Sequence, residues 1–503
     1  MSEEVKNKEE EEVIHLQVER HQWPDEVEMK TLRREHKHLM ILIYVLAILC
    51  GLLGGLAWSL RRRVLPGTAG DSTKFDEAMR IMTKEWFFAS EIEDPEGRMM
   101  DQALTGMTTN EEDPHTEYMS KEETESFMQS INRNFVGIGV QYFSTGDGIH
   151  MVERVFKGSP AEEAGVLPGD LIHIVDGVVV DDLTSTEVTD MVRGSENTNV
   201  EIDFIRGDET VHITIPRRPI NVTVFGEMLE EKTGYIEIMQ FGETTGDEMS
   251  TYLKDLIAQG AEKLIIDLRG NGGGYLEALR KVASLFVPKN TVLMKQVYAD
   301  GSEEVLRAIG GQLWDEGEII LLVDSDTASA SEVFTLALTE NRDDVRTVGT
   351  TTYGKGTVQI TYTFSDSSAL KYTTGKWVSP NDVWVNHVGI EPDYKVELHP
   401  VLKALFPDME EGNSTAYDSV SEYNRIAQMA LDYLGYPIER TDGYFSAHMQ
   451  EVITSFQHER ELEENGILDR PTYNSLIGAV IYDWNTTKIH DNVLMKAEEL
   501  LHE

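Results

Sequence analysis

A long apolar run lies near the N-terminus, after a polar and acidic segment. Residues 1–37 show no repeating apolar face, so we predict a flexible cytoplasmic tail. Leu39–Leu60 carries no charged side chain, and as a helix its 22 residues rise about 33 Å, enough for a hydrocarbon core of roughly 30 Å. We therefore predict a transmembrane helix over residues 38–60. A signal peptide is the alternative, but the run exceeds the usual apolar region of about 7–15 residues.

Helical periodicity marks residues 74–133. Apolar positions such as Met79, Met82 and Trp86 form a broad stripe at helical spacing. The pattern breaks at Asp113-Pro-His-Thr-Glu-Tyr118, because proline disfavours helix at the residue before it. This stretch is predicted to be an N-terminal helical region with a turn at the proline motif.

Short alternating runs with Gly and Pro between them characterise residues 134–218, which predicts a small β-domain. One helix is expected over 185–193. The predicted strands cover residues 137–142, 148–152, 170–175, 200–205 and 211–215.

Strands and helices alternate over residues 219–398, which predicts an α/β core. The runs 263–268 and 319–323 are candidates for buried strands. The polar stretch 399–420 is typical of a linker, and the remainder from Ser421 to Glu503 is expected to form a small helical module.

The charge balance and the cysteine count exclude several functions. Lys and Arg number 44 against 89 Asp and Glu, which gives a formal net charge of -45. Such an acidic surface repels phosphate backbones, so we expect no nucleic-acid partner. The single cysteine, Cys50, allows neither an intrachain disulfide nor a thiolate metal cluster. His36 and His38 lack carboxylate or cysteine support, and we predict no metal site and no cofactor.

A serine and a lysine each follow a predicted strand. Ser329 precedes the helix-compatible run 332–338, where free N–H groups stabilise negative charge. Lys355 lies between two glycines, and burial could lower the pKa of its ammonium enough for the amine to act as a base. Taken alone, Ser329 is better explained as a helix cap and Lys355 as an exposed turn residue. A neutral lysine can nevertheless deprotonate a serine hydroxyl, which makes the pair a candidate for nucleophilic catalysis.

A glycine loop supplies the third element of the candidate site. Asn271-Gly-Gly-Gly274 follows a predicted strand, and its backbone amides can approach a substrate carbonyl closely. We assign the N–H groups of Gly273 and Ala330 to an oxyanion hole. Gln359, four residues after Lys355, could orient the lysine amine through a hydrogen bond.

Three segments together resemble the carboxyl-terminal processing (tail-specific) proteases: Asp267-Leu-Arg-Gly-Asn-Gly-Gly-Gly274, Ser329-Ala-Ser-Glu332 and Tyr353-Gly-Lys-Gly-Thr-Val-Gln359. The motifs at 113–118 and 387–393 are also similar to that family. The resemblance implies a ClpP/crotonase-like α/β core with Ser329 as nucleophile, Lys355 as general base and Gln359 as its orienting partner. Ser331 is the rival nucleophile. Two loops depart from the family pattern: Gly272 stands where proline is frequent, and 341–345 is one residue longer than usual.

Two further resemblances concern the flanking domains. Phe135-Val-Gly-Ile-Gly139, Ser159-Pro-Ala-Glu-Glu-Ala-Gly165 and Pro168-Gly-Asp-Leu-Ile172 resemble a circularly permuted bacterial PDZ domain inserted at 134–218. Its backbone amides at Gly137, Ile138, Gly139 and Val140 would capture a free peptide C-terminus. Residues 421–490 resemble a peptidoglycan-binding domain of the three-helix type.

These resemblances imply a membrane-anchored serine endopeptidase that acts on envelope proteins through their C-terminal tails. Because peptidoglycan lies outside the cytoplasmic membrane, the single-pass bacterial membrane protein would have its catalytic region outside. The family also implies a homodimer through the helical segment. A non-catalytic PDZ scaffold at the wall and a Ser-His-Asp hydrolase using His387 are the alternatives. The sequence lacks the Gly-x-Ser-x-Gly elbow that is typical of many such hydrolases.

Overall fold

The computed structural model describes residues 72–502, apart from residues 133, 145–147, 182 and 208. The chain divides into two compact units between Gln102 and Ala103. The predicted tail at 1–37 and the predicted transmembrane helix at 38–60 lie outside the described residues. No helix in the described part of the chain is both long and apolar enough to cross a membrane.

The segment from residue 72 to residue 132 is mainly helical, as its periodicity predicts. After the turn at the proline motif, the chain forms a short strand rather than a direct continuation into helix. The elements are α2 (Ser72–Lys84), η1 (Phe87–Glu91), α3 (Pro95–Thr108), β1 (Glu117–Met119) and α4 (Lys121–Asn132).

An antiparallel domain is inserted between β2 (Asn134–Gly137) and β9 (Arg218–Asn221), which pair with each other. Its sheet has the order β3-β4-β5-β7-β8, with β6 beside β5. Alternate side chains such as Val200, Ile202 and Phe204 are buried in its core. The elements are β3 (Val140–Ser144), β4 (His150–Val155), α5 (Pro160–Ala164), β5 (Leu171–Val175), β6 (Val178–Val179), α6 (Ser185–Val192), β7 (Asn199–Arg206) and β8 (Glu209–Pro216).

The central sheet of the α/β core has the order β10-β11-β12-β15-β16-β19. All neighbouring pairs are parallel except β10 with β11. The predicted buried strands are confirmed as β12 and β15. The strands are β10 (Val224–Met228), β11 (Thr233–Ile238), β12 (Lys263–Asp267), β15 (Ile319–Val323), β16 (Val345–Gly349) and β19 (Tyr394–Lys395), and η2 (Glu230–Lys232) joins the first two.

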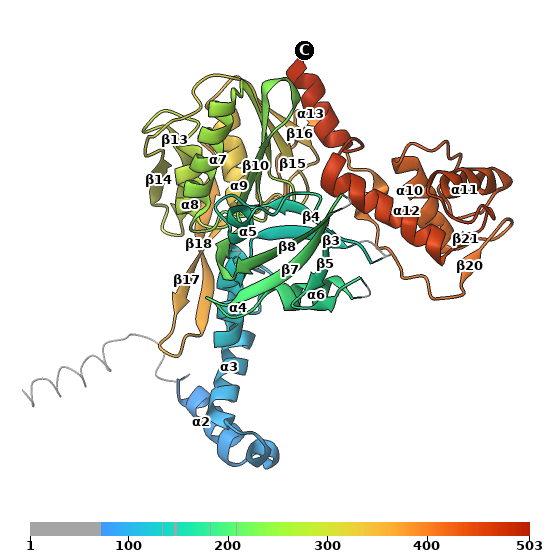
Figure 1. Cartoon of the computed structure of the whole chain (residues 1–503). Helices are drawn as coiled ribbons and strands as arrows, with labels where there is room; N and C mark the ends of the chain where they lie inside the picture. The colour runs from blue at the N-terminus through green and yellow to red at the C-terminus, as the bar shows by residue number, and fades with distance from the viewer. Residues whose placement is uncertain (1–71, 133, 145–147, 182, 208, 503) are drawn as a thin grey trace, which may run out of the picture. The chain divides into compact units, whose positions relative to one another are not determined.

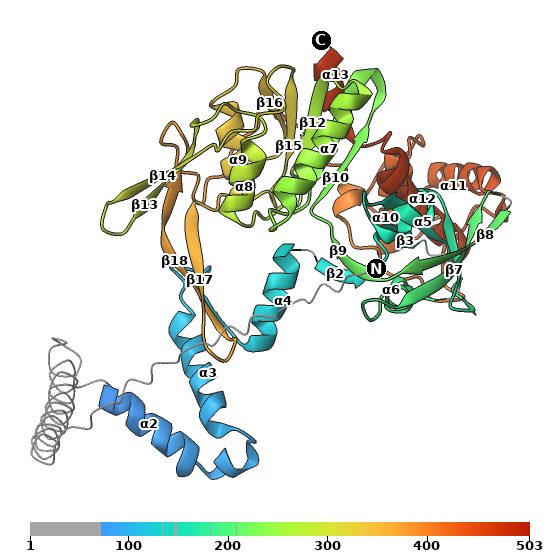
Figure 2. The ribbon, with the colours of Figure 1, turned by 60° about the vertical axis from the view of Figure 1, so that its left-hand side comes forward.

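The two faces of this sheet pack against different parts of the chain. Leu264, Ile266 and Leu321 point into the larger core, which also contains residues of α7 (Thr245–Gln259), α8 (Leu276–Ala283) and α9 (Ala330–Thr339). Figures 1 and 2 show these three helices gathered beside the sheet. Ile265, Ile320 and Leu322 point to the other face, where they pack against α13 (Asn492–His502).

A second sheet carries the lysine segment. Its order is β1-β18-β13-β14, and β17 also pairs with β18. The long strand β18 therefore joins the N-terminal strand β1 to the segment that follows Lys355. The remaining strands are β13 (Val292–Tyr298), β14 (Glu303–Arg307), β17 (Thr357–Thr363) and β18 (Ala369–Val378).

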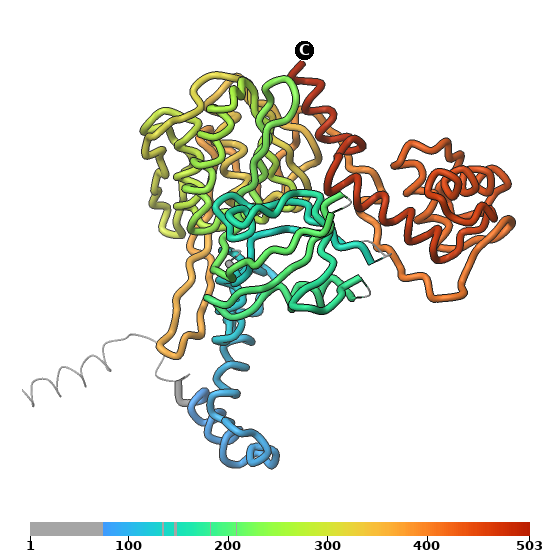
Figure 3. The backbone as a smooth tube through the Cα atoms, in the orientation of Figure 1, coloured from blue at the N-terminus to red at the C-terminus, as the bar shows by residue number. Residues whose placement is uncertain are grey.

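A helical module follows the core, and two of its features differ from the sequence prediction. Val401 and Met409, inside the predicted linker, are buried in the module's core. The last helix, α13, was expected within the module but packs on the protease core. In Figure 3 the backbone can be followed through this helix to the C-terminus. The elements are η3 (Pro400–Lys403), β20 (Ser414–Thr415), α10 (Glu422–Tyr433), α11 (Ala447–Glu459), β21 (Leu468–Asp469), α12 (Arg470–Tyr482) and η4 (Asp483–Thr487).

Candidate active site

Ser329 lies immediately before α9 in a backbone conformation that few residues adopt. Its φ is +56° and its ψ is −117°. Non-glycine residues with positive φ are uncommon and cluster at functional sites, because the surrounding structure must compensate for their strain. The next residue, Ala330, is the first of the helix, so its N–H has no acceptor within the helix. Ser329 thus projects at a helix N-terminus that favours negative charge.

The glycine loop packs directly against this serine. Gly273 has a φ of +101°, and a Cβ on it would lie 2.8 Å from the nitrogen of Ala330 and from Ser329 Cβ. Only glycine fits there. The Gly273 N–H, one of the two predicted oxyanion donors, donates to Asn271 Oδ1 at 2.9 Å.

The rival nucleophile Ser331 occupies a different environment. Its side chain is fully buried, and its hydroxyl donates to the Asn271 carbonyl at 3.0 Å. The Ala328 N–H donates to the same carbonyl, also at 3.0 Å. Ser331 therefore ties the helix to the glycine loop, whereas Ser329 lines an open cleft.

A buried carboxylate joins the serine segment to the lysine loop. Glu332 is fully buried, and its two oxygens accept four hydrogen bonds. One comes from the Ser329 N–H at 2.9 Å, and the others come from Thr352 Oγ1 at 2.6 Å and the N–H groups of Gly354 and Lys355 at 2.8 Å. Several charge-assisted bonds to one carboxylate hold the two loops in a fixed relation.

Lys355 is partly buried and lines the same cleft as Ser329. Burial lowers the pKa of its ammonium from the ordinary value, and the positive charge of Lys371 lowers it further. Glu117 and Glu332 act in the opposite direction but do not reverse the shift. The lysine is thus biased towards the neutral amine that a general base requires.

Gln359 lies on β17 and lines the same cleft as Lys355. Its amide nitrogen donates to Thr357 Oγ1 at 2.9 Å and to Thr373 Oγ1 at 3.0 Å. Thr373 Oγ1 in turn donates to Asp113 Oδ1 at 3.0 Å, which ties the proline motif to this network. The bonds fix the amide of Gln359, and its role towards Lys355 stays a prediction.

The cleft that contains these residues has a volume of about 960 Å³. Ser329, Lys355 and Gln359 line it together with Gly272 and Gly274. Apolar side chains from α4 and β17 supply much of the remaining wall, including Phe127, Met128, Ile131 and Ile360. A cleft of this volume that combines apolar side chains with polar groups suits a polypeptide segment.

Histidine is missing from the described lining of this cleft. His387, the histidine expected for a Ser-His-Asp centre, is exposed on a turn with a φ of +61°. His115 is the histidine whose pKa responds to Lys355: burial lowers that pKa first, and the lysine charge lowers it further. Lys355 lines the same cleft as Ser329, whereas His387 is not among the described lining residues. No cluster of His, Cys, Asp or Glu that could hold a metal occurs among the described residues.

The predicted peptide-binding residues line a separate groove in the inserted domain. Its volume is about 280 Å³, and Gly137, Ile138, Gly139 and Val140 form one side of it. Gly139 has a φ of +83°, and a Cβ there would lie 2.3 Å from Ser159 Cβ. Residues from α6, Thr189 and Val192, form part of its lining.

The sequence analysis missed two residues, one buried beside the active-site cleft and one lining it. Glu332 stood inside a quoted motif, and a charged residue in an otherwise apolar helix was a signal that it is buried for a reason. Lys371 lies on β18 and points into the cleft, but nothing in its local sequence distinguishes it from an exposed strand lysine. Only the pairing of β17 with β18 brings it near Lys355.

Comparison with known proteins identifies the class to which this fold and site belong. Family models match for peptidase family S41 over residues 232–396, a PDZ domain over 151–206 and a "Putative peptidoglycan binding domain" over 424–476. The chain is 33% identical over 414 residues to the carboxy-terminal processing protease CtpA of Bacillus subtilis, covering 82% of this chain and 87% of that protein. The chain therefore belongs to the carboxy-terminal processing proteases of peptidase family S41, and it is a serine peptidase.

Other similar proteins carry related descriptions. A "Probable CtpA-like serine protease" of Staphylococcus haemolyticus is 31% identical over 402 residues, 80% of each chain. The solved structure of a photosystem II D1 C-terminal processing protease is 23% identical and covers 66% of this chain and 94% of its own, with a TM-score of 0.37.

Proposed function

We propose that the protein is a membrane-anchored serine endopeptidase of the bacterial envelope, with Ser329 and Lys355 as its catalytic dyad. The main support for the proposal is the position of Glu332. Its fully buried carboxylate accepts hydrogen bonds from the backbone N–H groups of both Ser329 and Lys355. A nucleophile and a base on different loops must keep a fixed separation, and one shared carboxylate provides it. The lowered pKa of Lys355 supports its role as base.

In the proposed reaction the neutral amine of Lys355 takes the proton of the Ser329 hydroxyl as its oxygen attacks the peptide carbonyl. The tetrahedral intermediate collapses when the Lys355 ammonium gives that proton to the departing amine, and an acyl-enzyme remains. Lys355 then takes a proton from water as the water oxygen attacks the ester, and it returns that proton to the Ser329 oxygen as the new C-terminus leaves. Gln359 keeps the amine oriented through both halves.

The N–H groups of Ala330 and Gly273 form the oxyanion hole of this proposal. Ala330 offers a free first-turn N–H, and Gly273 lies close enough to Ala330 that a side chain would collide with it. The substrate oxygen replaces Asn271 Oδ1 as the acceptor of the Gly273 N–H. Each donor then strengthens its bond as negative charge develops on the oxygen.

The flanking domains define where the protease works and what it receives. The groove at Gly137–Val140 takes the C-terminal carboxylate of a protein substrate, which adds as a strand beside β3. Residues 421–490 bind peptidoglycan, and the helix at 38–60 anchors the chain so that the catalytic region lies outside the cytoplasmic membrane. Exposed aromatic side chains such as Phe87 and Phe88 support a homodimer through the helical segment. The parallel sheet with α7–α9 on one face supports a ClpP/crotonase-like core.

The decisive test compares cleavage of an unfolded protein by the wild type and by Ser329→Ala, Lys355→Ala and His387→Ala. We expect the first two substitutions to abolish cleavage and the third to leave it unchanged. Cleavage that survives Lys355→Ala contradicts the dyad, and loss with a folded His387→Ala supports the triad instead. Absence of cleavage in the wild type favours a scaffold.

A further inference from the structure

The last helix of the chain completes the protease core, although the helical module separates it from that core in sequence. Val493, Leu494, Ala497, Leu500 and Leu501 are all buried against the second face of the central sheet. Their partners on the sheet are Tyr235, Ile265, Ile320, Leu322 and Val348. Lys263 and Arg346 also donate to backbone carbonyls near the end of α13. The module is thus connected to the core at both of its ends.

Asp491, the residue before α13, has a carboxylate with two sets of partners. Its Oδ1 accepts from the N–H groups of Val493 and Leu494, both at 3.1 Å, which satisfies the start of the helix. The same carboxylate accepts from Arg269 Nη1 at 3.1 Å and Nη2 at 2.9 Å. The side chain is fully buried, so both contacts are shielded from water.

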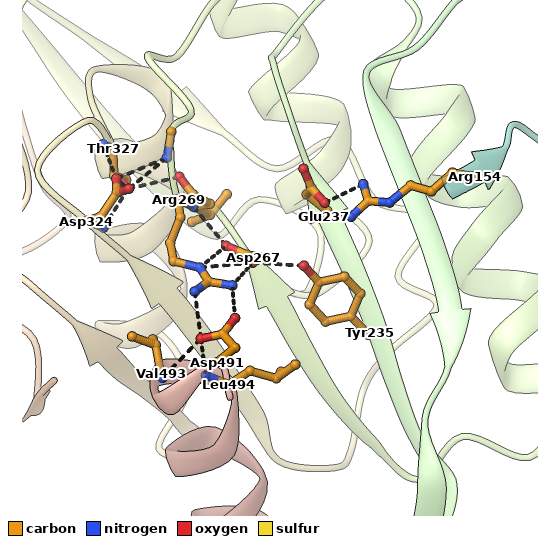
Figure 4. A network of polar contacts seen from close by, with 12 residues as sticks. Arg154, Tyr235, Glu237, Asp267, Arg269, Asp324, Thr327, Asp491, Val493 and Leu494 are labelled. Carbon is orange, nitrogen blue, oxygen red and sulfur yellow. Dashed lines mark hydrogen bonds and ion pairs between the residues drawn. The ribbon is translucent and has the colours of Figure 1, made fainter. Parts of the chain in front are cut away.

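Arg269 lies between Asp491 and a second buried carboxylate, Asp267, at the end of β12 (Figure 4). Its Nη2 donates to Asp267 Oδ2 at 2.6 Å, and the Tyr235 hydroxyl donates to the same oxygen at 2.8 Å. The two carboxylates raise the pKa of Arg269 well above its ordinary value, and the arginine lowers that of Asp267 against the effect of burial. The guanidinium therefore has charged partners on two sides and no freedom to reorient.

Arg269 is also two residues before Asn271, where the glycine loop begins. Between them, the Gly270 N–H donates to Asp324 Oδ1 at 3.0 Å, so this part of the backbone is held as well. The carbonyl of Asn271 accepts from Ser331 and Ala328, beside the nucleophile. A displacement of Arg269 would therefore also shift Gly273 and Ala330, because residues 270–271 connect them through a short, hydrogen-bonded segment.

We propose that Asp491 is a positioning residue of the protease: through Arg269 it fixes the glycine loop 271–274 against Ser329. The proposal rests on the proposed function of Ser329 and of the Gly273 and Ala330 amides. Among the described residues, none of the side chains or N–H groups that hydrogen-bond to the Asp491 carboxylate lines the catalytic cleft, so we expect Asp491 to act on the rate of the chemical step and not on substrate binding. The segment that ends the wall-binding module thereby contributes to the catalytic centre.

The test uses the full-length protein in detergent and the variant Asp491→Asn, which removes the charge but keeps the shape. We expect kcat to fall on the order of 10- to 100-fold at an unchanged KM, because a small displacement of catalytic groups has an effect of that order. Hydrogen exchange of the amides at 270–274 should accelerate. Asp491→Glu, which restores the charge, should recover part of the loss in kcat.

Two matched controls separate positioning from general stability. Asp483→Asn makes the same change at a buried carboxylate whose partners are Tyr433, Thr487 and His490 rather than Arg269, and should leave kcat unchanged. Leu501→Ala removes packing from α13 without touching Arg269, and should lower the Tm but not kcat. If Asp491→Asn lowers the Tm as Leu501→Ala does and keeps the wild-type kcat and amide exchange, the proposal is wrong.

The proposal can still be tested if Asp491→Asn does not fold, or if Ser329 proves not to be the nucleophile. If Asp491→Asn does not fold, Asp491→Ser, which can still cap α13 but has no carboxylate for Arg269, is compared in the same two measurements, and wild-type kcat and exchange in that variant overturn the proposal. If Ser329→Ala keeps activity, the proposed chemistry fails, but exchange at 270–274 still decides whether Asp491 holds the loop.

Discussion

The catalytic cleft and the groove of the PDZ domain both use glycine-rich backbone, but they are held in different ways. Behind the cleft lining, buried charges fix the backbone: Glu332 bonds to both loops, and Arg269 lies between two carboxylates. The groove rests on an apolar core around Ile138 and Val188, with a glycine packed against Ser159. A site that performs chemistry needs fixed polar groups, whereas a site that binds varied peptide ends needs mainly shape and free amides. Changes in the cleft should therefore affect kcat, and changes in the groove should affect recognition.

Gly273→Ala should have the largest effect. The new Cβ would collide with the backbone of Ala328 and Ala330 at 2.8 Å, and the positive φ adds strain. We expect kcat to fall by about 10²–10³, the scale of losing one oxyanion donor. Gly272→Ala is the matched control, because its Cβ would meet nothing within 4 Å. Similar losses in both variants would contradict the assigned role of Gly273.

Glu332→Gln should have the next largest effect. The amide can no longer accept four hydrogen bonds, and its NH₂ group would face backbone donors, so we expect stability to fall by about 2–5 kcal/mol. Activity should fall on the order of tenfold or more. Because Glu332 raises the pKa of Lys355, its loss should also move the alkaline inflection of kcat/KM to lower pH. Denaturant unfolding and a pH–rate profile measure both changes.

Gly139→Ala tests the other side of the comparison. Its Cβ would overlap Ser159, so the groove must deform. We expect KM for substrates with a favourable C-terminus to rise about tenfold, while acylation of Ser329 by a small ester is unchanged. Gly207→Ala, also at positive φ in this domain but in open space, controls for backbone strain. A loss of small-ester acylation in Gly139→Ala alone would show that the groove and the cleft are not independent.

Lys371→Gln should have the smallest effect and the opposite sign to Glu332→Gln. Removing this positive charge raises the pKa of Lys355, so the pH at which kcat/KM reaches half of its maximum should increase. Lys355 keeps a folded-state pKa below its unfolded value, so the protein gains stability as pH rises through the interval between them. Lys376→Gln on the same strand is the control, since Lys376 packs over Trp384 and does not line the cleft.

Much of this arrangement could be predicted because local pattern determines it. The strands β12 and β15 are continuous apolar runs, and the motifs containing Ser329, Lys355 and Gly273 each follow a strand end. Parallel strands bring such ends to the same edge of a sheet. The sequence left Ser331 as a rival to Ser329. The structure separates the two serines, because Ser331 is buried and Ser329 lines the cleft.

The parts that could not be predicted depend on contacts between distant segments. The apolar stripe of α13 indicates that one face is buried, but amphipathicity does not identify the surface that it covers. Lys371 and Asp491 look like ordinary surface residues in sequence, and their roles arise from the pairing of β17 with β18 and from the return of the chain to the core. Val401 and Met409 were assigned to a linker because the stretch 399–420 contains the polar run Gly412-Asn-Ser-Thr415.

The central claim is that Lys355 is the base for Ser329. The most direct measurement is the rate of acylation of Ser329 by a small activated ester as a function of pH, in the wild type and in Lys355→Ala. The account predicts a sigmoidal rise with an inflection below the ordinary lysine pKa in the wild type, and no inflection with a rate lower by about 10²–10⁴ in the variant. An unchanged inflection in Lys355→Ala that disappears in His387→Ala would contradict it.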